Sequence, residues 1–331
     1  MVAELCELLK LELVRINLTP MSKQISLSLI ISFLILACTA EKKDSTQNTP
    51  AKDYEAVSLL GDTLRFNPPS AAAVAKFEER KANYDADPSA DNWIWYGIFI
   101  AYQGKYNEAI EVYTEGIDKF PEDARFYRHR GHRYISIREF DKAIADFTKA
   151  AALREGMENE IEPDGAPNAQ NIPVSSLHGN IYYHLGLAHY LKGELEPALA
   201  AYKNAIAASR MDDNVVSGTH WVYMILRKMG REEEATKALE PINKDMKIIE
   251  NFAYHELCLF YKGELSLEEL TKSGEGALSS NDAVNYGIGN WYLYNGDEAK
   301  AKEVYEAILA KKGWASFGYI AAEADLHDVQ R

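Results

Sequence analysis

A set of aromatic and small residues recurs along this chain with a period of 34 residues, and this repeat constrains the fold more than any other feature. The recurring positions are Trp93, Gly97, Gly104, Ala109 and Tyr113, which return as Tyr127, Gly131, Arg138, Ala143 and Phe147. One position departs from the pattern, because Arg138 stands where the first unit has Gly104. Periods of about 20–50 residues are typical of repeat proteins, in which similar units stack on their neighbours. The sequence therefore predicts a continuous stack of similar units.

Each unit is predicted to contain two antiparallel helices. Gly97 and Ala109 are small, and we expect them where the two helices approach most closely, with aromatic residues filling the space between them. Gly104 is expected to end the first helix, since glycine tolerates the left-handed conformation of a helix cap. Pro121 is expected to stop the second helix, because proline cannot continue one. The unit is thus a helix, a turn, a second helix and a stop.

The first unit also resembles a known repeat. Its pattern is Trp93-x2-Tyr96-Gly97, followed by Ala109-x3-Tyr113 and Pro121. This pattern is similar to the tetratricopeptide signature of an aromatic residue, a Leu-Gly pair, a Tyr, an Ala, an aromatic residue and a Pro. The resemblance implies an all-α fold, a tetratricopeptide-type alpha-alpha superhelix that forms a right-handed solenoid.

The repeat frame also divides the chain. Clear repeats are predicted at 90–123, 124–157 and 179–212, and degenerate helical pairs at 213–246, 250–279 and 282–313. The array over 90–331 is expected to be continuous and to end in a capping helix at 314–329. A capping segment at 54–89 precedes it, in which Ser70 is predicted to cap a helix from Ala71 to Tyr84.

One stretch interrupts the period. Gly131 and Gly186 hold the same repeat position but lie 55 residues apart instead of 34, and the excess falls around 154–176. This stretch contains three prolines and an Asp-Gly pair, so it cannot be helical throughout. Loops longer than about 15 residues in a compact fold are usually either functional or disordered, and the sequence leaves both alternatives open.

The N-terminal region is predicted to be a targeting segment. An apolar run from Ile25 to Ala37 follows Met21-Ser-Lys, as in a secretory signal, and it is shorter than the roughly 20 residues that span a bilayer. The run ends in Leu34-Ile35-Leu36-Ala37-Cys38, which resembles the bacterial lipobox. The resemblance implies that residues 1–37 are a signal peptide and that Cys38 is diacylated and becomes the new N-terminus.

Residues 1–20 carry three glutamates against one lysine and one arginine, the wrong sign for the start of a signal, so the true start is predicted at Met21. Residues 38–53 are polar and predict a flexible tether behind the lipidated cysteine. The expected location is the bacterial cell envelope, with a lipid anchor. Thr39 rather than Asp follows the cysteine, which in enterobacterial lipoproteins allows transfer to the outer membrane. Whether the protein faces the periplasm or the cell surface stays open.

Composition and motifs argue against several function classes. The chain has 50 acidic and 36 basic residues and a formal net charge of −14, which argues against nucleic acid as a partner. Its three cysteines form no CxxC pair, and Cys258 is expected to be a buried helix residue. No GxSxG, P-loop or HExxH pattern occurs. We therefore predict that the protein is not an enzyme and has no cofactor.

A group of five histidines leaves open the alternative of a metal-binding or enzymatic protein. His129 and His132 lie three residues apart in the predicted first helix of repeat two, and His178, His184 and His189 lead into and along the matching helix of repeat three. Three of these imidazoles could meet. No Asp or Glu completes a site at helical spacing, so packing within the helices is the favoured interpretation and no bound metal is predicted. The alternative is a metal-binding or enzymatic lipoprotein that uses this histidine group.

The resemblance to tetratricopeptide arrays implies a concave groove lined by the first helix of each pair. When the ligand-facing positions of such arrays are transferred to the equivalent repeat positions of this chain, the residues expected to face a ligand are Arg125, Arg128, His132, Asn180, Tyr183, Leu187, Tyr190, His220 and Arg227. This surface is aromatic and locally basic, so an acidic segment or a C-terminal carboxylate is the expected partner. The sequence thus predicts a membrane-anchored scaffold that binds proteins or peptides. A structural subunit of an outer-membrane assembly is a further alternative.

Overall fold

The computed structural model describes residues 53–65, 68–163, 165–272, 281–311 and 313–329. The predicted signal peptide, Cys38 and the tether before residue 53 lie outside the described residues. The chain from Asp53 onward forms one structural unit. Within its described part, no helix combines the length and the apolar character that crossing a membrane requires.

The described residues form fourteen α-helices and one short antiparallel hairpin. The hairpin pairs β1 (Ala56–Val57) with β2 (Thr63–Leu64), Ala56 lying opposite Leu64. The helices are α3 (Ala71–Ala86), α4 (Ala90–Tyr102), α5 (Tyr106–Lys119), α6 (Ala124–Ser136), α7 (Phe140–Leu153), α8 (Leu177–Leu191), α9 (Leu195–Ala207), α10 (Asp212–Lys228), α11 (Glu232–Ala238), α12 (Phe252–Tyr261), α13 (Leu267–Thr271), α14 (Asp282–Tyr294), α15 (Glu298–Leu309) and α16 (Phe317–Val329). The predicted all-α fold is confirmed, and the hairpin is a feature that the repeat pattern does not predict.

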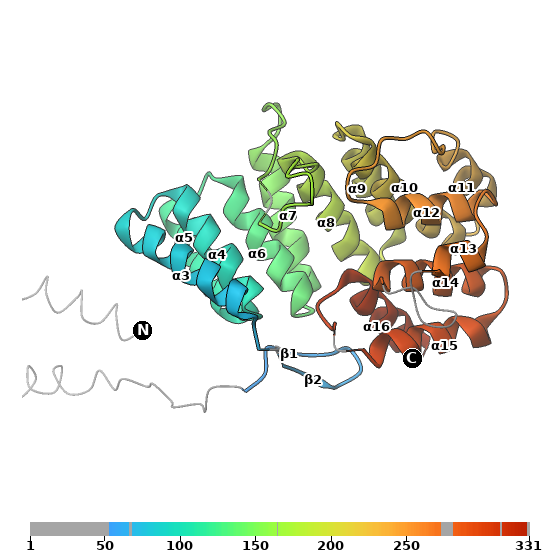
Figure 1. Cartoon of the computed structure of the whole chain (residues 1–331), viewed down its shortest axis with the longest axis horizontal. Coiled ribbons are helices and arrows are strands. Elements are labelled where there is room, and N and C mark those ends of the chain that lie inside the picture. The colour runs from blue at the N-terminus through green and yellow to red at the C-terminus, as the bar shows by residue number, and fades with distance from the viewer. Residues whose placement is uncertain (1–52, 66–67, 164, 273–280, 312, 330–331) are drawn as a thin grey trace, which may run out of the picture. The chain divides into compact units, whose positions relative to one another are not determined.

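Consecutive helices pack in pairs, α4 with α5, α6 with α7, α8 with α9 and α14 with α15, and Figure 1 shows these pairs following one another along the chain. As expected, the two helices of a pair approach closely at the repeat glycine. A Cβ atom at Gly97 of α4 would lie 2.4 Å from the Cε1 atom of Tyr113 of α5. The side chain of Ser70 accepts a hydrogen bond from the Ala73 N–H and caps α3 as predicted.

The turn inside each pair uses a left-handed backbone conformation. Gly104 has a φ of 80° between α4 and α5, and Arg138 has a φ of 67° in the equivalent turn between α6 and α7. A non-glycine residue in this conformation costs on the order of 1 kcal/mol. Arg138 is therefore expected to make a stabilising contact that offsets this backbone cost.

Arg138 provides that contact by joining repeat two to the C-terminal end of the chain. Its guanidinium donates hydrogen bonds to the carboxylate of Glu323 in α16, the shortest at 2.6 Å, and to the carbonyl of Trp314 at 2.8 Å. Glu323 also accepts a hydrogen bond from the Leu59 N–H at 2.7 Å, and the Trp314 indole donates to the Arg65 carbonyl at 2.6 Å. The side chains of Arg138 and Glu323 are 3% and 1% exposed. These five residues form what we call the closure junction.

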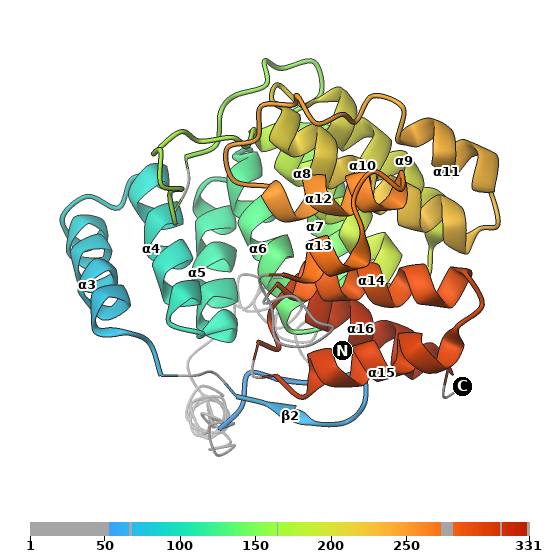
Figure 2. The same ribbon diagram turned by 45° about the vertical axis from the view of Figure 1, so that its right-hand side comes forward.

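The last helix reaches beyond the last repeat. α16 packs against α14 and α15, as Figure 2 shows, and it also contacts α8 of repeat three. Phe317 at its start lies 5.3 Å from the ring of His132 and 5.5 Å from the ring of His184, measured between ring centroids. The C-terminal helix therefore covers part of the face that the first helices present.

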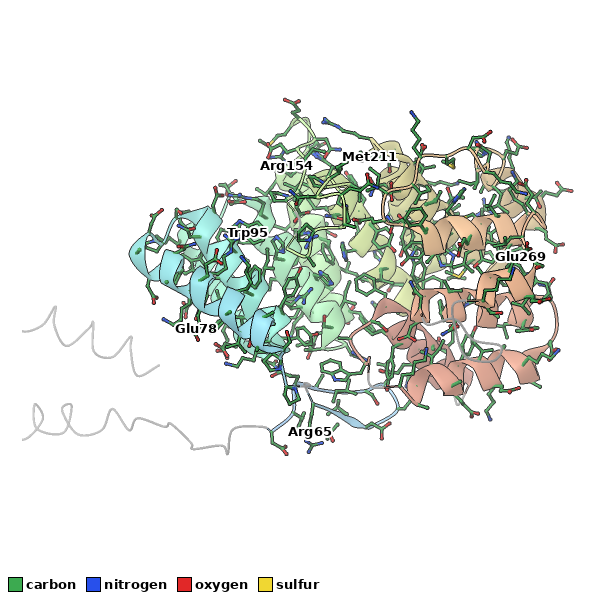
Figure 3. The ribbon with its side chains drawn as sticks, in the orientation of Figure 1. Arg65, Glu78, Trp95, Arg154, Met211 and Glu269 are labelled. Atoms are coloured by element: carbon green, nitrogen blue, oxygen red, sulfur yellow. The ribbon has the colours of Figure 1, made fainter. Side chains whose placement is uncertain are left out.

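The 154–176 stretch connects α7 to α8 without a helix, and Figure 3 labels Arg154, the C-cap residue that follows α7. Its described residues are held by hydrogen bonds: Glu162 donates its N–H to the Ser175 carbonyl at 3.0 Å, and Leu177 donates to the Glu160 carbonyl at 2.9 Å. The Asn159 amide donates to the Ala208 carbonyl at 2.9 Å. These contacts fold the loop back over α6 and α8 and place Glu162 between them.

Candidate binding groove

A cavity of about 280 Å³ lies between the first helices and the 154–176 loop, and we call it the loop cavity. The walls come from α4, α5, α6 and α8. The residues that matter for its chemistry are Tyr102, Tyr113, Arg128, His132, Arg133 and Asn180. The loop covers this cavity, so part of the predicted ligand face is occupied by the chain itself.

Glu162 of the loop places a carboxylate among the polar side chains of the cavity. Its Oε1 atom lies 3.1 Å from Nε of Arg128 and 3.2 Å from Nε2 of His129, and its Oε2 accepts a hydrogen bond from the Asn180 amide at 2.6 Å. The Arg128 guanidinium also lies 3.1 Å from Nδ1 of His129. Because a guanidinium can only donate, Nδ1 accepts, and the proton of the neutral ring lies on Nε2, facing Glu162. We call Arg128, His129 and Asn180 the carboxylate cradle.

The electrostatics of the cradle favour a negative charge at this position. Burial alone would raise the pKa of Glu162, but the charge of Arg128 and the His129 ring, whose Nε2 lies 3.2 Å from Oε1, lower it to about 2. Burial, together with the charge of Arg128, lowers the pKa of His129 to about 4. At neutral pH the cradle therefore holds an ionised carboxylate with one cation and two neutral donors.

Arg133 lines the same cavity, but it has no ion pair with any described residue. Its guanidinium carbon lies 5.3 Å from the centroid of the Tyr106 ring. The pKa of Arg133 is lowered by burial, against the opposing effect of the Tyr113 and Tyr106 phenols, and the charge of Arg128 lowers it further. The cavity thus contains a cation whose environment lacks a compensating negative charge among the described residues.

A second hollow of about 200 Å³ continues the first along the array. Its walls come from α8, α10, α12 and α16, and they include Tyr183, Tyr254 and Phe317. The two hollows share three lining residues, which are Ser175, Asn180 and Glu250. We call the two hollows together the groove, and it runs across the first helices of repeats one to four.

Four of the predicted ligand-facing residues line this groove. Arg128 and His132 border the loop cavity, Asn180 borders both hollows, and Tyr183 borders the second. The Tyr183 hydroxyl accepts a hydrogen bond from the Trp221 indole at 2.8 Å. The structure thus brings these side chains together on one face, and their role in binding a ligand stays a prediction.

Three other predicted residues, Leu187, Tyr190 and His220, are buried within the helix packing. The hydroxyl of Tyr190 lies 2.5 Å from that of Tyr286 in α14, and Nδ1 of His220 lies 3.1 Å from the Tyr261 hydroxyl in α12. These residues do not face an open groove, because α12, α14 and α16 pack against the part of the first-helix face that they occupy.

Arg125 and Arg227 are placed elsewhere. Arg125 lies outside the loop cavity and forms ion pairs with Asp91 and Asp123, both at 2.6 Å. Arg227 lies 4.5 Å from the centroid of the Tyr294 ring and 2.9 Å from a carboxylate oxygen of Glu232. Both guanidinium groups therefore have partners within their own neighbourhood.

The histidine group is brought together only in part. The rings of His132 and His184 lie 4.6 Å apart, and His129 lines the loop cavity together with His132. His178 instead contacts the Asn159 side chain, and His189 lies 2.6 Å from the Glu194 carboxylate. Across the described ranges, no three His, Cys, Asp or Glu side chains are arranged to hold a metal ion. Cys258 is buried in α12, as expected.

Sequence reasoning missed several residues that shape the groove. Glu162 lies in the loop, outside the repeat frame, and no pattern links it to Arg128. Phe317 belongs to the capping helix, whose contact with repeat two spans most of the array. Arg138 belongs to the closure junction and does not line the groove, and the sequence does mark it, because it is the one departure from the first repeat pattern.

Comparison with known proteins finds tetratricopeptide repeats in this chain. Two tetratricopeptide-repeat family models match residues 101–159 and 179–210. The small glutamine-rich tetratricopeptide repeat-containing protein 2 of Saccharomyces cerevisiae is 33% identical over 101 residues, which are 30% of this chain and 23% of that protein. The chain therefore matches about a quarter of that relative's length.

The solved structures that match this chain have low sequence identity and TM-scores below 0.5. YrrB, described as a TPR protein with an unusual peptide-binding site, is 16% identical with a TM-score of 0.40, covering 77% of this chain and all of its own. The Cut9–Hcn1 hetero-tetramer of the APC/C gives 16% identity and a TM-score of 0.44, covering 78% of this chain and 44% of that one. MamA gives 18% identity and a TM-score of 0.36, covering 51% and 80%. With the helix pairs described above, the matching family models identify this chain as an all-α superhelix that contains tetratricopeptide repeats.

Proposed function

We propose that this protein is a membrane-anchored scaffold that binds a protein or peptide partner in the groove. The observation that carries the proposal is the carboxylate of Glu162, which lies among Arg128, His129 and Asn180 on the first-helix face. An acidic side chain of the chain itself is thus accommodated where an acidic ligand is expected. A partner with an acidic segment or a C-terminal carboxylate fits this chemistry.

The lining of the groove supports the same proposal. Tyr102, Tyr183 and Tyr254 offer aromatic surface, and Tyr102 is 43% exposed. Tyrosine supplies large contact area and a polar end, and it is enriched among residues that dominate binding energies. The groove therefore offers aromatic walls beside charged donors, although the chain as a whole is acidic.

The groove is tested with a partner obtained by co-purification from detergent-solubilised membranes. Tyr102→Ala should weaken binding of that partner by about 2 kcal/mol, roughly thirtyfold, in a calorimetric titration. Phe252→Ala is the matched control, because Phe252 is 53% exposed and lies outside the groove lining. Equal effects of the two substitutions would place the partner elsewhere on the molecule.

The anchor is tested separately. Cys38 and the segment before it motivate the proposal by their resemblance to a lipobox. Wild-type protein should incorporate labelled palmitate and sediment with membranes, whereas Cys38→Ala should do neither. Retention of the Cys38→Ala variant in the membrane fraction, without label in the wild type, would contradict lipid anchoring.

A further inference from the structure

We propose that the loop cavity is a binding site for one carboxylate group, with the guanidinium of Arg133 as its main ligand. The proposal rests on the proposed function, because it names the chemical group that the groove takes. The proposed site at Arg133 is distinct from the carboxylate cradle, because Glu162 of the chain itself already occupies the cradle.

The four arginines of α6 provide the first argument. Arg125, Arg128 and Arg130 each lie within 3.1 Å of a carboxylate, on Asp91, Glu162 and Asp146 respectively. Arg133 is partly buried on the same helix, and it has no such partner among the described residues. A desolvated cation without a counter-ion is unfavourable, so an anion that enters this cavity gains more than it would at the surface.

The carboxylates that line the cavity do not fill this role. Glu162 is held by the cradle, and Glu250 accepts a hydrogen bond from the Asn168 amide at 2.8 Å. The ring of His132, beside Arg133 in the chain and in the cavity, makes no hydrogen bond to a described residue. The cavity therefore contains a guanidinium and a neutral imidazole that are both available to an incoming ligand.

The size and shape of the loop cavity limit which ligands can bind in it. A volume of about 280 Å³ admits a single side chain, a chain terminus or a small organic acid. The loop comes close on one side, since a Cβ atom at Gly165 would lie 2.7 Å from the Tyr102 hydroxyl. A planar carboxylate matches the donors of a guanidinium in a two-point contact, and the rings of Tyr102 and Tyr113 bound the space for its carbon atoms.

The first test uses acetate and succinate as probes, with neutral acetamide as the control ligand, on the whole chain. At a saturating concentration, the two acids should raise the melting temperature of the wild type by about 2 °C and acetamide should not. Arg133→Gln should abolish this shift, and Lys142→Gln, on the exposed side of α7, should keep it. No shift in the wild type, or an equal shift in Arg133→Gln, would overturn the proposal.

A second readout separates ligand binding from a structural role. Removing an uncompensated charge should leave the ligand-free Arg133→Gln protein at least as stable as the wild type. A lower melting temperature of ligand-free Arg133→Gln would instead mean that Arg133 serves to hold Tyr106, and would overturn the proposal.

The source of the carboxylate is decided with the co-purified partner. If Arg133→Gln raises the Kd of that partner at least tenfold, the partner supplies the carboxylate. If the acids bind through Arg133 and the Kd is unchanged, the ligand is a free small acid. The proposed function has its own readout in Tyr102→Ala, so loss of carboxylate binding and loss of partner binding are distinguishable.

Discussion

At the residue scale, the buried histidines are the side chains whose charge depends most on the fold. Burial and the charge of Arg128 lower the pKa of His129 to about 4 and that of His184 to about 3. Burial alone lowers the pKa of His220 to about 3. These imidazoles are neutral in the folded protein near pH 7, and they pack against aromatic rings as uncharged groups.

The depressed pKa values predict acid sensitivity. Between about pH 6.5 and pH 4 the unfolded chain binds protons on these histidines and the folded chain does not, so the free energy of unfolding falls as the pH is lowered. Each such histidine contributes a slope of about 1.4 kcal/mol per pH unit within that window. Urea unfolding at several pH values measures the slope, and His184→Gln should make it shallower. An identical slope in the variant and the wild type would contradict this account.

At the element scale, the distance between the two helices of a pair is set by a glycine packed against an aromatic ring. A Cβ atom would lie 2.4 Å from Tyr113 at Gly97, 2.7 Å from Tyr202 at Gly186, and 3.0 Å from Phe147 at Gly131. The three rings are essentially inaccessible to solvent, so an added methyl group has to be accommodated within the packed interior. The tolerance for an added methyl group therefore differs from one pair to the next.

This difference predicts a graded response to alanine. Replacing a helical glycine by alanine gains roughly 0.5–1 kcal/mol of backbone stability, whereas overpacking a core costs about 1–3 kcal/mol. Gly97→Ala should therefore destabilise the protein by about 1–2 kcal/mol, while Gly131→Ala should be close to neutral. Thermal or urea unfolding of both variants gives the comparison, and the reverse order of stabilities would show that the helices of the first pair can separate at little cost.

At the scale of the whole described unit, the closure junction links its N-terminal hairpin, repeat two and the C-terminal helix. The Arg138–Glu323 contact joins residues 185 positions apart in the chain, and both side chains are buried. In a simple array each repeat contacts only its neighbours. The closure junction adds a long-range contact to this nearest-neighbour arrangement. Its hydrogen bonds also explain why an arginine, Arg138, is found in a left-handed turn.

Breaking this ion pair should be costly. Glu323→Gln leaves the buried charge of Arg138 unpaired and should lower the free energy of unfolding by about 3–5 kcal/mol. Glu139→Gln, which removes an exposed partner of Lys142, should cost under about 1 kcal/mol. The double variant Arg138→Gly with Glu323→Gln removes both the stranded charge and the backbone cost, so it should recover much of the loss. Similar losses for Glu323→Gln and Glu139→Gln in urea unfolding would contradict a closing role.

The helix pairs and their turns could be predicted from the sequence alone. Contacts within a pair, such as Gly97 with Tyr113, recur at each period, so the residues that make them are visible as a repeated pattern. The left-handed turn at Gly104 follows from the same local rule. The lipidation of Cys38 stays an expectation from sequence, since it lies outside the described residues.

Which parts of the first-helix face stay open depends on tertiary contacts that the repeat pattern does not record. Glu162 enters the cradle from a loop without repeat positions, and the C-terminal helices bury Tyr190 and His220. Arg125, Arg128 and Arg130 each lie near a carboxylate, whereas Arg133 has no ion pair with a described residue, and this difference depends on the tertiary structure. The physical reason is the sequence separation of the contacting residues. A repeat pattern reflects contacts within and between neighbouring units, whereas these contacts join segments that share no period. The residue type at one position therefore does not specify its distant partner.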